Sequence, residues 1–194
     1  MKLDLLYFAW VRERIGIPRE KVETDAATVA DLIERFDDGK ASVEQQSEPP
    51  IAVTTFEVPG EPGYDTLLMQ PDARLSYTLD LPPAPVCLRV DTVMFPDSWS
   101  WEGDGASFVL EVEHDGETVR LLDEYLANEP LDQHWHPHLI DLSAYGGQTV
   151  RLTFQTGPGP AGDYVGDWAG WGMPRLVRPP TGDKCDTNAI VDLR

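Results

Sequence analysis

The sequence predicts a mostly β protein: an antiparallel β-sandwich of the jelly-roll type with a short α+β appendage at its N-terminus. Eight short runs of alternating apolar and polar residues, each bounded by turn residues, occur from about Gly60 to the end of the chain. The Asp115-Gly116 pair between two such runs is a strong hairpin signal. A content of 16 Gly and 17 Pro among 194 residues is typical of a loop-rich β protein.

The sandwich is expected to occupy residues 61–180, preceded by a polar linker at 39–60 and followed by an irregular tail at 181–194. Within the linker, Ile51–Val58 has the pattern of a first strand. The remaining expected strands are Thr66–Gln70, Ala73–Leu81, Val86–Val93, Ser107–His114, Glu117–Tyr125, Trp135–Asp141, Thr149–Thr156 and Gly170–Val177.

Residues 1–38 have a different pattern, which predicts two strands and a helix in a β-grasp-like order. Leu3, Leu5 and Tyr7 alternate as in a strand, and Glu20–Glu23 is a second candidate strand. Thr28 is a good N-cap for a short helix with Asp31 in its first turn.

The charge of the chain excludes several partners. With 15 basic and 34 acidic residues the formal net charge is −19, and no basic cluster for phosphate binding is present. Nucleic acid and anionic membrane surfaces would therefore be repelled. No apolar run approaches the ~20 residues of a membrane span, and the charged N-terminus is unlike a signal peptide. The N-terminus taken alone therefore predicts a cytosolic protein, although localisation stays open.

The two cysteines lie far apart in sequence and form no metal motif. Cys87 lies in the apolar strand Val86–Val90, where we expect a small buried side chain. Cys185 lies in a polar tail, where we expect a free thiol, and a disulfide between the two is the alternative.

The N-terminal segment resembles the start of the molybdopterin synthase small subunit, a ubiquitin-like sulfur carrier. The resemblance lies in Leu6-Tyr-Phe-Ala9, Arg12-Glu13-Arg14, Ile17 and Ala27-Thr-Val-Ala-Asp-Leu32, about a fifth of the chain. It implies a sulfur-transfer role in molybdopterin cofactor biosynthesis. Such carriers use a C-terminal Gly-Gly, whereas this sequence ends Asp192-Leu-Arg194, so we expect no thiocarboxylate.

The region from about 64 to 178 resembles the galactose-binding-domain-like jelly rolls. It is most similar to carbohydrate-binding modules that accompany glycosidases or bacterial membrane glycosyltransferases. The resemblance implies a non-catalytic module with a ligand site in its rim loops, and related jelly rolls often hold a structural calcium. The matching motifs are Leu81-Pro-Pro83, Trp99, Gly103-Asp-Gly105, Phe108, Trp135, Asp141-Leu-Ser-Ala-Tyr145-Gly-Gly-Gln-Thr-Val150 and Asp167-Trp-Ala-Gly-Trp171-Gly.

Aromatic and acidic residues in the expected loops are the candidate ligand contacts. Trp99, Trp101 and Trp168 could stack on the C–H faces of a sugar, since carbohydrate sites combine aromatic walls with a few polar partners. Trp135 and Trp171 have an alternative role as packing residues between the sheets.

The expected polar partners of a sugar are Asp104, Asp163 and Asp167, which lie in Gly-rich loops. The same three carboxylates are the candidate ligands for Ca²⁺, which prefers six or more oxygen ligands. Their alternative role is as ordinary turn residues.

Three histidines spaced by two, His134, His136 and His138, would share one face of a strand. We expect a solvated face of an edge strand there, with a zinc site as the alternative. Neither a nucleophile elbow nor a phosphate loop is present, so we expect no enzyme activity. The sequence thus favours a carbohydrate-binding module, with a sulfur-carrier-related protein and a structural or protein-interaction domain as alternatives.

Overall fold

The computed structural model describes residues 2–6, 19–23, 41–46, 51–178 and 185. Two compact units divide the chain, residues 1–42 and 43–194. In the first unit, β1 (Lys2–Leu6) and β2 (Arg19–Glu23) pair antiparallel, with Leu3 opposite Val22. These are the two strands expected near the N-terminus. The expected helix after Thr28 lies outside the described residues.

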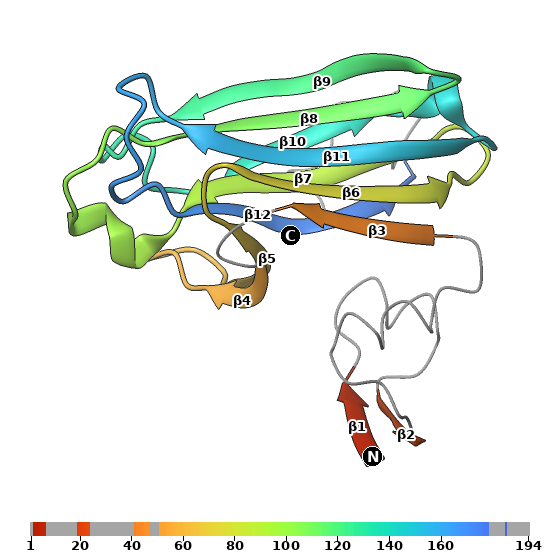
Figure 1. Cartoon of the computed structure of the whole chain (residues 1–194), viewed down its shortest axis with the longest axis horizontal. Helices are drawn as coiled ribbons and strands as arrows, with labels where there is room; N and C mark the ends of the chain where they lie inside the picture. Colours follow the sequence, from red (N-terminus) through yellow and green to blue (C-terminus); the bar gives the residue numbers. More distant parts are fainter. Residues whose placement is uncertain (1, 7–18, 24–40, 47–50, 179–184, 186–194) are drawn as a thin grey trace. The chain divides into compact units, whose positions relative to one another are not determined.

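The second unit is a sandwich of two antiparallel five-stranded sheets, as predicted (Figure 1). One sheet, here the front sheet, has the order β3-β6-β11-β8-β9, and the other, the back sheet, has the order β10-β7-β12-β5-β4. The front-sheet strands are β3 (Ala41–Gln46), β6 (Ala73–Asp80), β11 (Thr149–Pro158), β8 (Ala106–His114) and β9 (Glu117–Leu126). The back-sheet strands are β10 (His136–Asp141), β7 (Cys87–Met94), β12 (Ala169–Val177), β5 (Tyr64–Met69) and β4 (Ala52–Phe56).

The strands form where the alternating pattern placed them, because one face of each sheet is buried. In β8, for example, Phe108, Leu110 and Val112 are fully buried while the residues between them are more exposed. The Asp115-Gly116 hairpin is also confirmed, since both residues adopt positive φ angles of 51° and 79°. The stretch 39–60, which we expected to be mainly a linker, contributes β3 and β4 to the two sheets.

The core lies between the sheets, and a smaller apolar cluster covers the outer face of the back sheet. Trp171 is fully buried in the core, in edge-to-face contact with Phe108 and Phe154. On the opposite face, the ring of Trp135 lies against Gly172. A Cβ at Gly172 would come within 2.6 Å of that ring, so glycine is required for the contact. Both tryptophans therefore have packing roles on opposite faces of β12: Trp171 belongs to the strand and fills the core, and Trp135 covers the outer face of the strand.

A disulfide joins Cys87 of β7 to Cys185, with their Cα atoms 5.9 Å apart. The expectation of a free thiol at Cys185 is therefore wrong. The two cysteines are 98 positions apart in sequence, and this separation gave no indication of the pairing, because separation along the chain does not determine distance in the fold.

Two 3₁₀ helices are described, η1 (Pro96–Ser100) and η2 (Ser143–Tyr145). Within the described part of the chain, no helix has the length and apolar character required to cross a bilayer.

Candidate functional site

Three loops gather at one end of the sandwich and are called the rim below. They are residues 95–105 between β7 and β8, 127–135 between β9 and β10, and 159–168 between β11 and β12. They meet because β7, β9 and β11 all end at this side, with Met94 opposite Ala169 and Ala106 opposite both Leu126 and Pro158. All six residues predicted as ligand contacts lie in the rim: Trp99, Trp101, Asp104, Asp163, Asp167 and Trp168.

Trp101 is the predicted stacking residue with the greatest exposure, since 43% of its surface is accessible. Its ring stands edge-on to Trp168, with centroids 5.1 Å apart, and Trp168 in turn stacks on Phe95 at 5.4 Å. The backbone N–H of Phe95 donates to the carbonyl of Trp168 at 2.6 Å, which fixes the two loops against each other. The ring of Trp101 is thus supported by Trp168, while part of its surface remains accessible to solvent.

Trp99 has a different environment from Trp101. Its indole N–H donates to the carbonyl of Met94 at 3.0 Å, and its ring packs against both apolar clusters. Ser98, which directly precedes Trp99, is buried, and its backbone carbonyl accepts a hydrogen bond from the backbone N–H of Trp101. The structure therefore places Trp99 as a support of the rim and Trp101 as its exposed aromatic surface.

Asp104, Asp163 and Asp167 converge into one group, here called the acidic cage. One carboxylate oxygen from each lies within 4.8 Å of the others. Asp167 is fully buried, and neither of its carboxylate oxygens has a hydrogen-bond partner. Oδ1 of Asp104 is also buried and unpartnered, while its Oδ2 accepts a hydrogen bond from the backbone N–H of Ala161 at 2.6 Å. Three buried carboxylate oxygens are thus left without a hydrogen bond of normal geometry.

The electrostatics of the acidic cage disfavour charge on Asp167. Burial, followed by the neighbouring charges of Asp104 and Asp163, raises the pKa of Asp167 to about 6. The backbone N–H groups of Gly159 and Gly105 point toward the carboxylate of Asp167 and lower its pKa, but neither forms a hydrogen bond of normal geometry, so they offset only part of this rise. Near neutral pH the group therefore contains repelling carboxylates in a poorly solvated position.

A divalent cation fits this arrangement. Ca²⁺ takes oxygen ligands, and its two positive charges would satisfy the unpartnered carboxylate oxygens and relieve their repulsion. Asp163 contributes from the exposed side, where its Oδ1 also accepts a hydrogen bond from the backbone N–H of Val165 at 3.0 Å. The structure thus brings together the same three residues that the sequence analysis named, with one carboxylate oxygen of each close enough to the others to share a metal ion.

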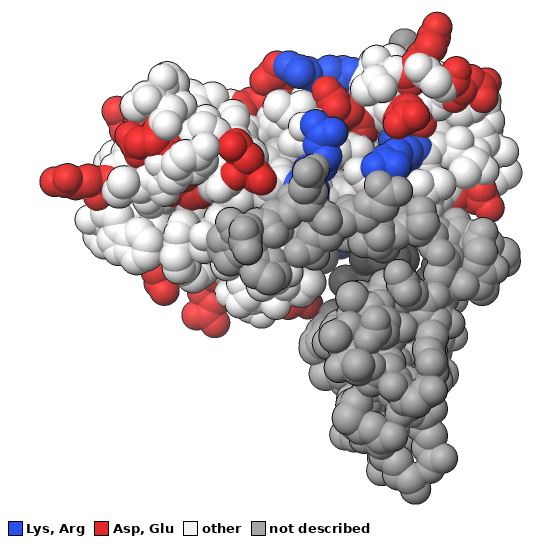
Figure 2. All heavy atoms as spheres, viewed as in Figure 1, with Lys and Arg blue, Asp and Glu red and all other residues white. Residues whose placement is uncertain are grey.

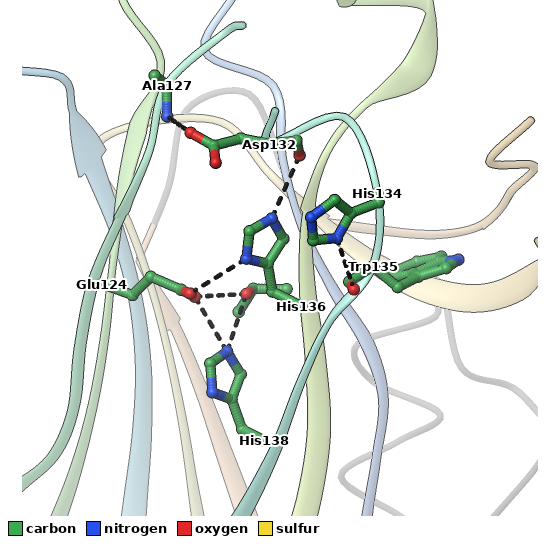
Figure 3. Close-up of polar contacts among 8 residues, drawn as sticks. Glu124, Ala127, Asp132, His134, Trp135, His136 and His138 are labelled. Atoms are coloured by element: carbon green, nitrogen blue, oxygen red, sulfur yellow. Dashed lines mark hydrogen bonds and ion pairs between the residues drawn. The ribbon is translucent and has the colours of Figure 1, made fainter. Parts of the chain in front are cut away.

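The histidines form a second polar group, here called the histidine–glutamate cluster (Figure 3). On β10, His136 pairs with Thr92 of β7 and His138 pairs with Val90. The two histidine side chains therefore lie on the same face of the back sheet as Thr92 and Val90, which is the face toward the interior of the sandwich. There they meet Glu124 of β9, at 3.5 Å for His136 Nδ1 and 3.0 Å for His138 Nε2. The expectation of a solvated face is wrong for these two residues, each of which has a side chain only 18% exposed.

The histidine–glutamate cluster satisfies its own polar atoms. The hydroxyl of Thr92 donates to Glu124 at 2.5 Å, and His136 Nε2 lies 3.3 Å from the backbone carbonyl of Asp132. The ring of His134, which is exposed, stacks on His136 with centroids 4.1 Å apart.

The pKa values of the histidine–glutamate cluster move in the directions expected for an ion pair. The pKa of Glu124 is lowered to about 2, because hydrogen bonds from His136, His138 and Thr92 outweigh the burial that alone would raise it. The pKa of His136 is raised, because Glu124 outweighs the burial that alone would lower it.

Several residues of the rim were not predicted from the sequence. Asn128 donates through Nδ2 to the carbonyls of Ser98 and Trp101, which ties two loops together. The hydroxyl of Tyr125 donates to the backbone carbonyl of Asp104. Glu124 and Tyr125 end a predicted strand, and nothing in their local pattern indicates a partner in another part of the fold.

Comparison with known proteins gives a limited result. No family model matches the chain. An uncharacterised protein of Archaeoglobus fulgidus is 36% identical over 92 residues, which cover 46% of this chain. The match spans only 23% of the length of that relative.

Solved structures with a similar fold are carbohydrate-binding modules. A CBM51 module from Clostridium perfringens, solved with methyl-galactose, is 17% identical and has a TM-score of 0.44, with coverage of 75% of this chain and 97% of the module. TmCBM61, solved with β-1,4-galactotriose, is 12% identical with the same TM-score, and the coverage is 81% and 99%. At these identities and scores, function has to be argued from the rim of this chain.

Proposed function

We propose that this chain is a non-catalytic carbohydrate-binding module that holds its ligand at the rim. The observation that carries the proposal is the exposed indole of Trp101, supported by Trp168 and Phe95 and placed beside loops rich in carboxylates. Aromatic rings bind the apolar faces of sugars, and neighbouring polar groups bind the hydroxyls. The sequence motifs shared with carbohydrate-binding jelly rolls support the same conclusion.

The acidic cage has a separate role in this proposal: it binds Ca²⁺ through Asp104, Asp163 and Asp167. Asp167 directly precedes Trp168, and Asp104 follows Trp101 by three residues. A cation held there would stabilise the two loops that carry the aromatic residues. We expect glycan binding to be stronger in Ca²⁺ than in EDTA for this reason.

The test is a glycan array probed with the wild type and with Trp101→Ala, in Ca²⁺ and in EDTA. We expect binding to at least one glycan and its loss in the variant, because the stacking of a sugar on the indole is lost while the fold is kept. Val119→Ala is the matched control, since Val119 is an exposed apolar residue at the other end of β9. Failure of the wild type to bind any glycan in either condition would overturn the proposal.

A protein ligand is the alternative that the same rim favours. Leu131, Tyr164 and Val165 are exposed to 82%, 56% and 55%, which gives the rim apolar area beyond what one sugar ring would cover. In that case the array would be blank, and Trp101→Ala would weaken binding to a protein in pull-down experiments that contain no sugar.

A further inference from the structure

The rim is negatively charged throughout. Its three loops contain seven acidic residues, and no lysine or arginine occurs within these described segments. Figure 2 shows this on one face: the end of the sandwich with the rim, on the left, has acidic and uncharged residues, while Lys and Arg residues appear over the strands. The acidic residues are Asp97, Glu102, Asp104, Glu129, Asp132, Asp163 and Asp167.

The carboxylates come from all three loops: Asp97, Glu102 and Asp104 from the first, Glu129 and Asp132 from the second, and Asp163 and Asp167 from the third. A bound cation would reduce this negative charge only in part. Ca²⁺ with the three aspartates of the acidic cage leaves a single negative charge there, and the other four carboxylates stay unbalanced.

We propose that the rim selects uncharged glycans and rejects acidic ones, namely uronates and sulfated or sialylated sugars. This rests on the proposed function and specifies its ligand class. Recognition of a sugar carboxylate or sulfate uses Arg or Lys donors, which the described rim loops lack. An anionic sugar beside Trp101 would instead face Asp97 and Glu102, both exposed, and like charges that face each other across an interface weaken binding.

The first experiment is an array on which neutral glycans stand beside their acidic counterparts. The pairs are lactose with 3′-sialyllactose, N-acetyllactosamine with its sulfated form, and methyl-esterified with free galacturonan. At low salt and in Ca²⁺ we expect each neutral member that binds to exceed its acidic counterpart by at least about tenfold. At 1 M salt the difference should shrink, because exposed charges are then screened over about 3 Å.

The outcomes separate the two proposals. Binding to acidic members as strong as to neutral ones overturns the charge selection but leaves a carbohydrate-binding module. Binding to no member, neutral or acidic, overturns the proposed function itself.

A charge-reversal variant tests the cause. Asp97→Lys/Glu102→Lys should improve binding to the acidic members by about tenfold or more and leave the neutral members within about twofold. Glu117→Lys is the matched control, because Glu117 is exposed at the hairpin at the opposite end of the sandwich. An unchanged ratio in the double variant would show that rim charge does not set the specificity.

Discussion

The acidic cage and the histidine–glutamate cluster both place carboxylates in poorly solvated positions, yet the pKa values move in opposite directions. Glu124 is surrounded by two imidazoles and a hydroxyl, and its pKa falls to about 2. Asp167 has two carboxylates as neighbours and no hydrogen bond of normal geometry, and its pKa rises to about 6. The first group contains both the carboxylate and its partners and joins the two sheets, whereas the second contains carboxylates with no cationic side chain among its three residues. This difference separates a structural polar cluster from a candidate binding site.

The largest effect on the free energy of unfolding is expected from the loss of the disulfide, which belongs to neither the acidic cage nor the histidine–glutamate cluster. Cys87→Ala/Cys185→Ala removes a disulfide that closes a loop of about 100 residues, for which the loss of stability is about 4 kcal/mol. Urea unfolding of the variant, and of the wild type in reductant, measures it. Both should keep the responses to Ca²⁺ and pH described below, since neither group contains the cysteines. An unfolding free energy that reductant leaves unchanged would contradict the disulfide.

Calcium should stabilise the protein through the acidic cage. At 100 times its Kd, Ca²⁺ adds about 2.7 kcal/mol, which for this size of domain raises Tm by about 5–10 °C. Asp167→Asn should remove that shift. Because the variant has no buried charge to compensate, it should also be at least as stable as the wild type in EDTA above pH 6. Thermal unfolding in Ca²⁺ and EDTA measures both effects.

Asp115→Asn is the control for the calcium experiment, since it makes the same change at an exposed hairpin tip. A full calcium response in Asp167→Asn would remove Asp167 from the site.

The histidine–glutamate cluster should make stability depend on pH in a different way. The lowered pKa of Glu124 gives a contribution present above about pH 4.5 that is lost as the pH falls toward 2. The raised pKa of His136 gives a contribution to stability that is fully present below about pH 6.5, the ordinary pKa of histidine. This contribution is lost as the pH rises through the raised pKa of the folded state. The contribution of the cluster is therefore greatest from about pH 4.5 to 6.5.

Glu124→Gln should lower stability by about 2 kcal/mol in that window and flatten its pH dependence, because charged hydrogen bonds are lost. Urea unfolding from pH 3 to 8 measures this, with Glu117→Gln as an exposed control on the same strand. A variant with an undiminished stability maximum in this window would show that the cluster does not produce it.

The smallest effect is expected at the exposed edge of the acidic cage. Asp163→Asn keeps an oxygen ligand but removes one charge, so we expect the Kd for Ca²⁺ to rise by about tenfold or less. The stability without calcium should change little, since Asp163 is exposed. Isothermal titration calorimetry measures the Kd. A loss of binding as complete as in Asp167→Asn would mean that both aspartates contribute equally.

Most of the strands could be predicted from sequence, because a strand with one buried face has alternating apolar and polar residues that can be recognised locally. The runs around Phe108 and Phe154 show it, and the observed bounds of β8 and β11 differ from the predicted ones by only a few residues. The linker was harder to predict. The polar pattern of Ala41–Gln46 gave no sign that it would join a sheet edge.

The candidate site could be predicted in its residues but not in its arrangement. Asp104 and Asp163 are 59 positions apart in sequence, and only the meeting of two loops at the rim brings their oxygens together. The different environments of Trp99 and Trp101 depend on the turn of η1, which directs one ring inward and leaves the other exposed. His136 and His138 were placed on the correct strand but on its solvated face, whereas their side chains face the interior; His134 is exposed, as expected.

The sequence by itself determined the β-sandwich class, the positions along the chain of the strands from β5 to β12, the Asp-Gly hairpin and the acidic composition of the rim. These features depend on neighbouring residues and on composition, which a chain displays without folding. The tertiary structure decided the partner of Glu124, the pairing of Cys87 with Cys185 and the opposite packing of Trp135 and Trp171. Those contacts depend on the register between strands and on which loops meet, and both arise only when the two sheets pack together.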